Sequence, residues 1–233
     1  MKLIKFTRIK ALLTGACLLW LALGGSANAA FLLESMGIVL DESEGRASFT
    51  VKNTSAEPIL LASKLEDLDG QEMSKNVLVS PPITRIDAGQ SQQVNFVLKK
   101  SAKLEREVML KASFEGIGQA KENAARMPIK QSIGMILQPI AVAVSKTPWD
   151  DLSLKMAGQT LVINNTGKHV VRLSPDLMLA PANEVVSLEN YYVMPGEERR
   201  LEVKSRPTTV KILPLSRYGF KLPEVVLKVA GNS

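Results

Sequence analysis

Phe49-Thr50-Val51-Lys52-Asn53-Thr54 is followed 112 residues later by a similar stretch, Leu161-Val162-Ile163-Asn164-Asn165-Thr166. Each stretch is an apolar run that leads into an Asn-Thr turn, which predicts a strand ending in a turn. A second pair repeats after 107 residues, because Ile86–Phe96 and Val193–Val203 each combine a glycine turn with a strand pattern. An offset of about 110 residues is the length of one immunoglobulin-like sandwich. The sequence therefore predicts an all-β fold of two tandem immunoglobulin-like β-sandwich domains.

A longer alternating stretch lies between the two repeats: Ala125-Arg126-Met127-Pro128-Ile129-Lys130-Gln131-Ser132-Ile133-Gly134-Met135-Ile136-Leu137. Apolar side chains occupy nearly every odd position, and successive strand residues point to opposite faces of a sheet. We therefore expect a strand over 125–137 with an apolar ridge on its odd-numbered face, after a strand over Val108–Phe114 and a loop over Glu115–Ala124. Taken alone, this pattern also fits an ordinary core strand.

The first 29 residues have the pattern of a secretory signal peptide. A basic segment over 1–10 precedes an apolar run over 11–24, and Ala27 and Ala29 satisfy the A-x-A rule for cleavage after Ala29. We reject Cys17 as a lipoprotein acceptor, because lipidation there would leave an apolar run at the mature terminus. The expected mature chain has no cysteine, so its own core must stabilise it and no thiol nucleophile is available.

We expect the mature chain to divide near Gln138-Pro139, into a first domain over 30–138 and a second over 139–233. The alternating stretch ends at this point, and a turn-rich segment begins at Thr147-Pro148-Trp149.

The basic character of the chain is concentrated in the signal segment. Lys2, Lys5, Arg8 and Lys10 are four of the 29 basic residues, which leaves 25 against 23 acidic residues in the mature chain. This balance gives no reason to expect a nucleic-acid partner. No later segment is apolar and long enough to span a bilayer, so we expect an exported, soluble product without membrane insertion.

Residues that could support catalysis are sparse. His169 is the only histidine, and it lies in the polar turn Asn165-Thr166-Gly167-Lys168-His169, where a turn role is the default. No serine stands in a nucleophile elbow, and the acidic loops lack the spacing of a calcium site. We therefore expect a binding protein rather than an enzyme, with no cofactor and no metal site.

The order of motifs over 30–229 resembles the PapD-like periplasmic chaperones that assemble pili by the chaperone-usher pathway. The most specific element is Pro-Pro-x-x-Arg-x-x-x-Gly, within Val79–Gly89. Phe31–Glu34 and Leu104–Glu107 fit the same template in the first domain. Asn190–Gly196 and Arg217–Gly219 fit it in the second.

This resemblance implies two sandwiches set at an angle, with a cleft between them that receives the C-terminal segment of a pilus subunit. The chaperone would lay its own alternating strand into the subunit's incomplete sandwich, until an outer-membrane usher takes the subunit on. The donor residues here would be Ala125, Met127, Ile129 and Ile133. The implied location is the periplasm of a Gram-negative cell.

The chain departs from the family at the base of the cleft, where a basic pair generally binds the carboxylate of the subunit. The matching positions here are Gly37 and Gly134, which offer no side-chain donor. A charge-assisted hydrogen bond contributes about 1.5 to 3 kcal/mol, so the loss of both calls for compensation. Lys111 and Lys130 are the candidate replacements, and either is also an ordinary solvent-facing lysine.

A second departure concerns the joint between the domains. The family links its domains through an acid, an arginine and an aspartate, and the matching residues are Glu107, Gln138 and Arg217. The opposite charges at the two outer positions predict a direct Glu107–Arg217 pair across the interface.

A different class of function remains open at this point. The chain could be a two-domain structural or adhesive module of the periplasm or cell surface that never donates a strand, and the missing basic pair favours that alternative. A chaperone should expose the edge around 125–129, whereas a structural module should cover or pair it.

Overall fold

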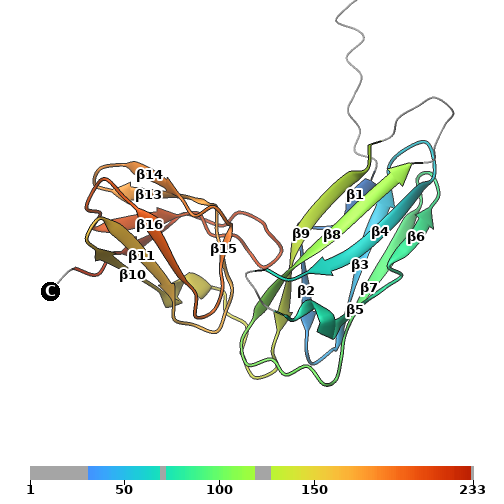
Figure 1. Cartoon of the computed structure of the whole chain (residues 1–233), viewed down its shortest axis with the longest axis horizontal. Coiled ribbons are helices and arrows are strands. Elements are labelled where there is room, and N and C mark those ends of the chain that lie inside the picture. Colours follow the sequence, from blue (N-terminus) through green and yellow to red (C-terminus); the bar gives the residue numbers. More distant parts are fainter. Residues whose placement is uncertain (1–30, 69–71, 119–126, 232–233) are drawn as a thin grey trace, which may run out of the picture.

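The computed structural model describes residues 31–68, 72–118 and 127–231. These residues form two stacks of strands joined after β9 (Ile129–Gln138), and the stacks lie at an angle to one another (Figure 1). The prediction of an all-β fold with two immunoglobulin-like domains is confirmed. In the part of the chain that the structure describes, no helix is long and apolar enough to cross a membrane.

The first domain is a sandwich of two sheets with strand orders β1-β3-β7-β5 and β2-β9-β8-β4-β6. Its strands are β1 (Phe31–Leu33), β2 (Gly37–Asp41), β3 (Arg46–Asn53), β4 (Ile59–Glu66), β5 (Val77–Ser80), β6 (Ile83–Ile86), β7 (Ser91–Leu98), β8 (Val108–Gly118) and β9. A short 3-10 turn at Ser74–Asn76 precedes β5.

The second domain has sheets with the orders β10-β11-β16, β12-β15 and β14-β13-β17-β18. Its strands are β10 (Leu152–Ala157), β11 (Thr160–Asn165), β12 (Val171–Arg172), β13 (Asp176–Ala180), β14 (Glu184–Ser187), β15 (Tyr192–Val193), β16 (Glu198–Glu202), β17 (Thr209–Ile212) and β18 (Val225–Lys228). The 3-10 turn Pro148–Asp151 leads into β10.

Each domain has its own hydrophobic core. In the first, Phe49 of β3 and Phe114 of β8 stack with ring centroids 5.2 Å apart and join the two sheets. The buried members of this core run from Phe31 to Leu137, whereas those of the second run from Trp149 to Ile212. The predicted boundary at 138–139 lies between these two sets.

The sequence repeat corresponds to a repeated hydrogen-bonding device. Asn53 and Asn165 end β3 and β11, and both side chains are fully buried. Each Nδ2 donates to the carbonyl four residues further on, at 2.8 Å in both cases. Each also donates at 3.0 Å to the first residue of the second repeat, Ile86 or Val193. A buried amide with satisfied donors therefore ties the same turn to the same neighbouring segment in both domains.

Two predicted boundaries in the first domain are wrong. β8 continues through Gly118, so Glu115–Gly118 belong to a strand and not to a loop. The described part of the alternating strand begins at Ile129, two residues later than Met127. Pro128 has no N–H to donate to a ladder, which explains why regular pairing starts after it. Ala125 lies outside the described residues.

Candidate functional site

β9 has one edge that is only partly covered. It pairs with β8 from Gly116↔Ile129 to Val108↔Leu137. On its other side β2 pairs in parallel from Gly37↔Gly134 onward. Among the described strands, none pairs with residues 129–133 on that side. This segment, which we call the free edge, presents backbone groups to an incoming strand.

The odd-numbered side chains along this strand change from exposed to buried. Met127 is 88% exposed, Ile129 is 37% exposed and Ile133 is 6% exposed and part of the first core. Met127 and Ile129 also line a hollow of about 450 Å³ with Ile59 and Gly116. The apolar ridge is thus anchored in the core at one end and open to solvent at the other.

The even-numbered face near the free edge carries an ion-pair cluster around Glu66. Its carboxylate lies 3.4 Å from the Lys111 ammonium and 3.8 Å from that of Lys130, while Ser113 donates a hydrogen bond at 2.8 Å. The Ser113 hydrogen bond, together with Lys64 and Lys111, lowers the pKa of Glu66 to about 2. Both lysines predicted as carboxylate anchors therefore already have a carboxylate beside them.

The two glycines at the base of the cleft lie opposite one another and beneath Arg172. A Cβ atom at Gly37 would lie 2.8 Å from Arg172 Nη1, and one at Gly134 would lie 3.5 Å from Arg172 Cζ and Nη2. Arg172 ends β12 of the second domain and is 7% exposed. The guanidinium of the second domain thus occupies space that side chains on β2 and β9 would fill.

The same guanidinium lines a pocket of about 330 Å³ beside the free edge. The pocket wall also includes Lys111, Ser132, Gly134 and Tyr191. Lys130 does not line this pocket but a hollow on the neighbouring surface. Of the two predicted anchors, Lys111 is therefore the one that faces the cleft.

A polar cluster joins the domains. The Arg217 guanidinium lies 3.2 Å from the Glu107 carboxylate and donates to the side-chain oxygen of Gln138. Glu107 is 3% exposed and accepts a hydrogen bond at 2.8 Å from the N–H of Val170. Burial raises the pKa of Glu107, while the Val170 N–H, Arg217 and His169 oppose that shift. The three residues matched to the family's interdomain positions thus lie together.

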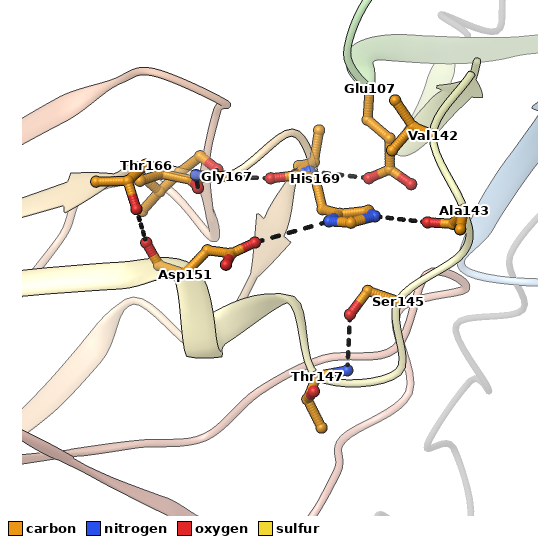
Figure 2. Close-up of polar contacts among 12 residues, drawn as sticks. Glu107, Val142, Ala143, Ser145, Thr147, Asp151, Thr166, Gly167 and His169 are labelled. Atoms are coloured by element: carbon orange, nitrogen blue, oxygen red, sulfur yellow. Dashed lines mark hydrogen bonds and ion pairs between the residues drawn. The ribbon is translucent and has the colours of Figure 1, made fainter. Parts of the chain in front are cut away.

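His169 belongs to this joint. Its Nε2 lies 2.8 Å from the carbonyl oxygen of Ala143, in the segment that links the domains, and its Nδ1 lies 3.9 Å from the Asp151 carboxylate (Figure 2). The described residues contain no group of three or more His, Cys, Asp or Glu side chains that could hold a metal ion.

An apolar cluster completes the interface. Met109 of β8 packs with Val170, Tyr192 and Met194 of the second domain, and all four are buried. Apolar packing and a polar cluster thus both join the two domains, and in this arrangement Arg172 lies over the glycine pair.

Two sandwiches with a free strand edge beside an interdomain cleft define this protein as a two-domain binding protein of the immunoglobulin-like class. Residues 30–143 match the family described as pili and flagellar-assembly chaperone, PapD N-terminal domain. The first domain of the chain belongs to this PapD-like chaperone family.

Curated relatives agree with this assignment. "Uncharacterized fimbrial chaperone YhcA" of Escherichia coli (strain K12) is 28% identical over 191 residues, which cover 81% of this chain and 85% of the relative. "Chaperone protein PmfD" of Proteus mirabilis (strain HI4320) is 27% identical over 212 residues, which cover 86% of this chain and 83% of the relative.

Solved structures share the fold. A chain in "Salmonella enterica SafA pilin in complex with the SafB chaperone" superposes with a TM-score of 0.74 at 18% identity, covering 88% of this chain and 98% of that chain. The E. coli chaperone DraB superposes with a TM-score of 0.72 at 20% identity, and the match covers 85% of this chain and 97% of that chain.

Arg172 is the residue that the sequence reasoning missed. It follows Val170 and Val171 and precedes Leu173, so it is a charged residue within a buried apolar run. That position was the available signal, because a charge in such a run is rare unless it has a partner or a function.

Proposed function

We propose that this protein is a periplasmic chaperone that binds pilus subunits by strand donation from β9 and delivers them to an outer-membrane usher. The expected signal peptide over 1–29 would bring it to the periplasm. The donor residues are Met127, Ile129 and Ile133, together with Ala125. The role is binding and not catalysis.

The free edge of β9 is the observation that carries this proposal. An unpaired edge with exposed apolar side chains is an aggregation hazard, and proteins usually blunt such edges with charges, bulges or covering segments. Here no described strand pairs with the free edge, and the apolar side chains of Met127, just before it, and Ile129, at its start, are exposed. An added strand would gain backbone hydrogen bonds, and a subunit groove would bury both side chains, at about 1.5 to 3 kcal/mol for each.

The alternative is a structural or adhesive module that never donates a strand. Such a module should cover or pair this edge, since nothing would offset the hazard of leaving it open. The exposure of Met127 favours the chaperone.

The proposal is tested by producing a pilus subunit together with wild-type protein or with the variant Met127→Asp plus Ile129→Asp. Burying two carboxylates in an apolar groove is costly, so we expect the variant to retain little or no subunit in the periplasm. Val185→Asp plus Val226→Asp is the matched control, because these residues are 61% and 54% exposed on the edge strands β14 and β18. Equal subunit recovery with all three proteins would reject strand donation at β9.

A further inference from the structure

Gly37 and Gly134 leave room that Arg172 fills. A Cβ atom at Gly37 would also lie 2.9 Å from the carbonyl oxygen of Arg217 and 3.0 Å from the Cα of Tyr218. These are backbone atoms that cannot move aside as the end of a flexible side chain can. A side chain at position 37 is therefore incompatible with the present position of the second domain. The base of the cleft still holds a cation, but the second domain supplies it.

Arg172 has an incomplete set of partners for a buried charge. Its Nη1 donates to the carbonyl oxygen of Arg217 at 2.8 Å, and its Nε has no hydrogen-bond partner. Among the described residues, no carboxylate lies within 4.0 Å of its guanidinium. Glu107, the acid of the interdomain joint, is committed to Arg217 and to the Val170 N–H. A guanidinium that is 7% exposed and lacks an anion is costly, so the site favours an incoming negative group.

The position of Arg172 relative to the free edge determines which charged end of an added strand can reach its guanidinium. β2 begins at Gly37 and runs parallel to β9, so a strand added along residues 129–133 must end where β2 begins. An added strand parallel to β9 brings its C-terminal carboxylate to this point. An antiparallel strand would bring its N-terminal ammonium against the guanidinium, which is repulsive.

We propose that Arg172 binds the C-terminal carboxylate of the pilus subunit, and that it thereby sets the direction and register of the added strand. This inference rests on the proposed function of β9. The planar guanidinium can bind a carboxylate through two parallel N–H bonds, which a single lysine cannot do. Lys111 lines the same pocket, but its ammonium lies 3.4 Å from Glu66 and remains a flanking charge.

The test uses the full mature chain and two synthetic peptides with the C-terminal sequence of a pilus subunit, one with a free α-carboxylate and one with a carboxamide. For the wild type we expect the carboxylate peptide to bind roughly tenfold to a hundredfold more tightly, the range of a charge-assisted hydrogen bond. In Arg172→Gln this preference should disappear, while the affinity for the carboxamide peptide stays unchanged. In Lys111→Gln most of the preference should persist.

The assignment of Arg172 would be overturned if Arg172→Gln still bound the carboxylate peptide more tightly than the carboxamide peptide by the full wild-type factor. It would also be overturned if Lys111→Gln lost this preference while Arg172→Gln kept it. Equal binding of both peptides to the wild type would also overturn it, yet would leave strand donation intact. Failure of either peptide to bind the wild type would instead count against the proposed function of β9, so the two failures are distinguishable.

A second variant tests the same site in case Arg172→Gln does not fold. Arg172→Ala combined with Gly134→Lys removes the guanidinium and places a cation on β9 in the space that it leaves. The neighbour at position 134 is the flexible end of Met109, 2.5 Å from the added Cβ, and it can turn aside. We expect the carboxylate preference to return in this variant and to be absent from Arg172→Ala alone. If the double variant folds but binds the two peptides equally, a cation at the base of the cleft is not what binds the carboxylate, and the proposal is contradicted.

Discussion

At the scale of single residues, the fold depends on polar side chains whose partners come from distant segments. Asn53 and Asn165 were visible in the sequence as the ends of repeated strands, but their buried amides were not predicted. A turn pattern reveals a local hydrogen bond, whereas the bonds to Ile86 and Val193 require the folded domain. The role of Arg172 could not be predicted for the same reason, since its relation to Gly37 and Gly134 depends on how the two domains pack.

Asn165→Ala should lower the free energy of unfolding by about 2 kcal/mol or more. The change leaves the buried carbonyl of Val193 without its side-chain donor, and the Gly167 N–H loses its acceptor. Urea unfolding measures this loss. Asn164→Ala is the control, because this neighbouring side chain is half-buried, and we expect a change of less than about 0.5 kcal/mol for it. Similar losses for the two variants would show that the buried amide has no special role.

At the scale of elements, β9 combines two functions in one strand. Its second half pairs with β2 and contributes Met135 and Leu137 to the core, whereas its first half, residues 129–133, keeps a free edge. The alternating pattern predicted the strand and its apolar face. The pattern could not predict where pairing with β2 begins, because the β2 residues lie 97 positions earlier in the sequence than their β9 partners (134 − 37 = 97).

The cluster on β4, β8 and β9 should make stability depend on pH through Glu66. Its pKa is lowered to about 2 from 4.5, so its contribution is present above about pH 4.5 and is lost as the pH falls toward 2. Because its ion pairs are partly exposed, we expect Glu66→Gln to cost about 1 kcal/mol at neutral pH. The difference from the wild type should shrink as acid is added, and urea unfolding at about pH 7 and about pH 3 measures it. Glu44→Gln is the control, because it removes one exposed carboxylate. A difference in unfolding free energy between the wild type and Glu66→Gln that grows as the pH falls would contradict the prediction.

At the scale of the whole molecule, the angle between the domains is what makes the cleft a site. The resemblance to a family indicated that Glu107, Gln138 and Arg217 belong to the joint, and the structure places them in contact. The apolar part of the joint was not predicted. Met109 and Tyr192 look like ordinary core residues in the sequence, because burial between domains and burial within one have the same composition.

Arg217→Ala should destabilise the protein by about 2 to 3 kcal/mol near neutral pH, because it leaves the Glu107 carboxylate buried without its cation. Burial already raises the pKa of Glu107, and loss of Arg217 should raise it further. A buried acid with a raised pKa stabilises the folded state more as the pH falls, so the deficit should shrink from about pH 7 to about pH 5. Urea unfolding across this range measures the effect. Adding Glu107→Ala should recover part of the loss, and a double variant with the summed loss of both single variants would mean that the two residues do not interact.

The central claim is that the free edge of β9 receives a strand from a pilus subunit. Amide hydrogen exchange of the protein, measured alone and with the bound subunit, tests this claim most directly, because a new ladder protects backbone N–H groups. We predict that protection rises at residues 129–133 on binding, while the edge strands β14 and β18 of the second domain are unchanged. A bound subunit that leaves exchange at 129–133 as fast as in the free protein would contradict the account.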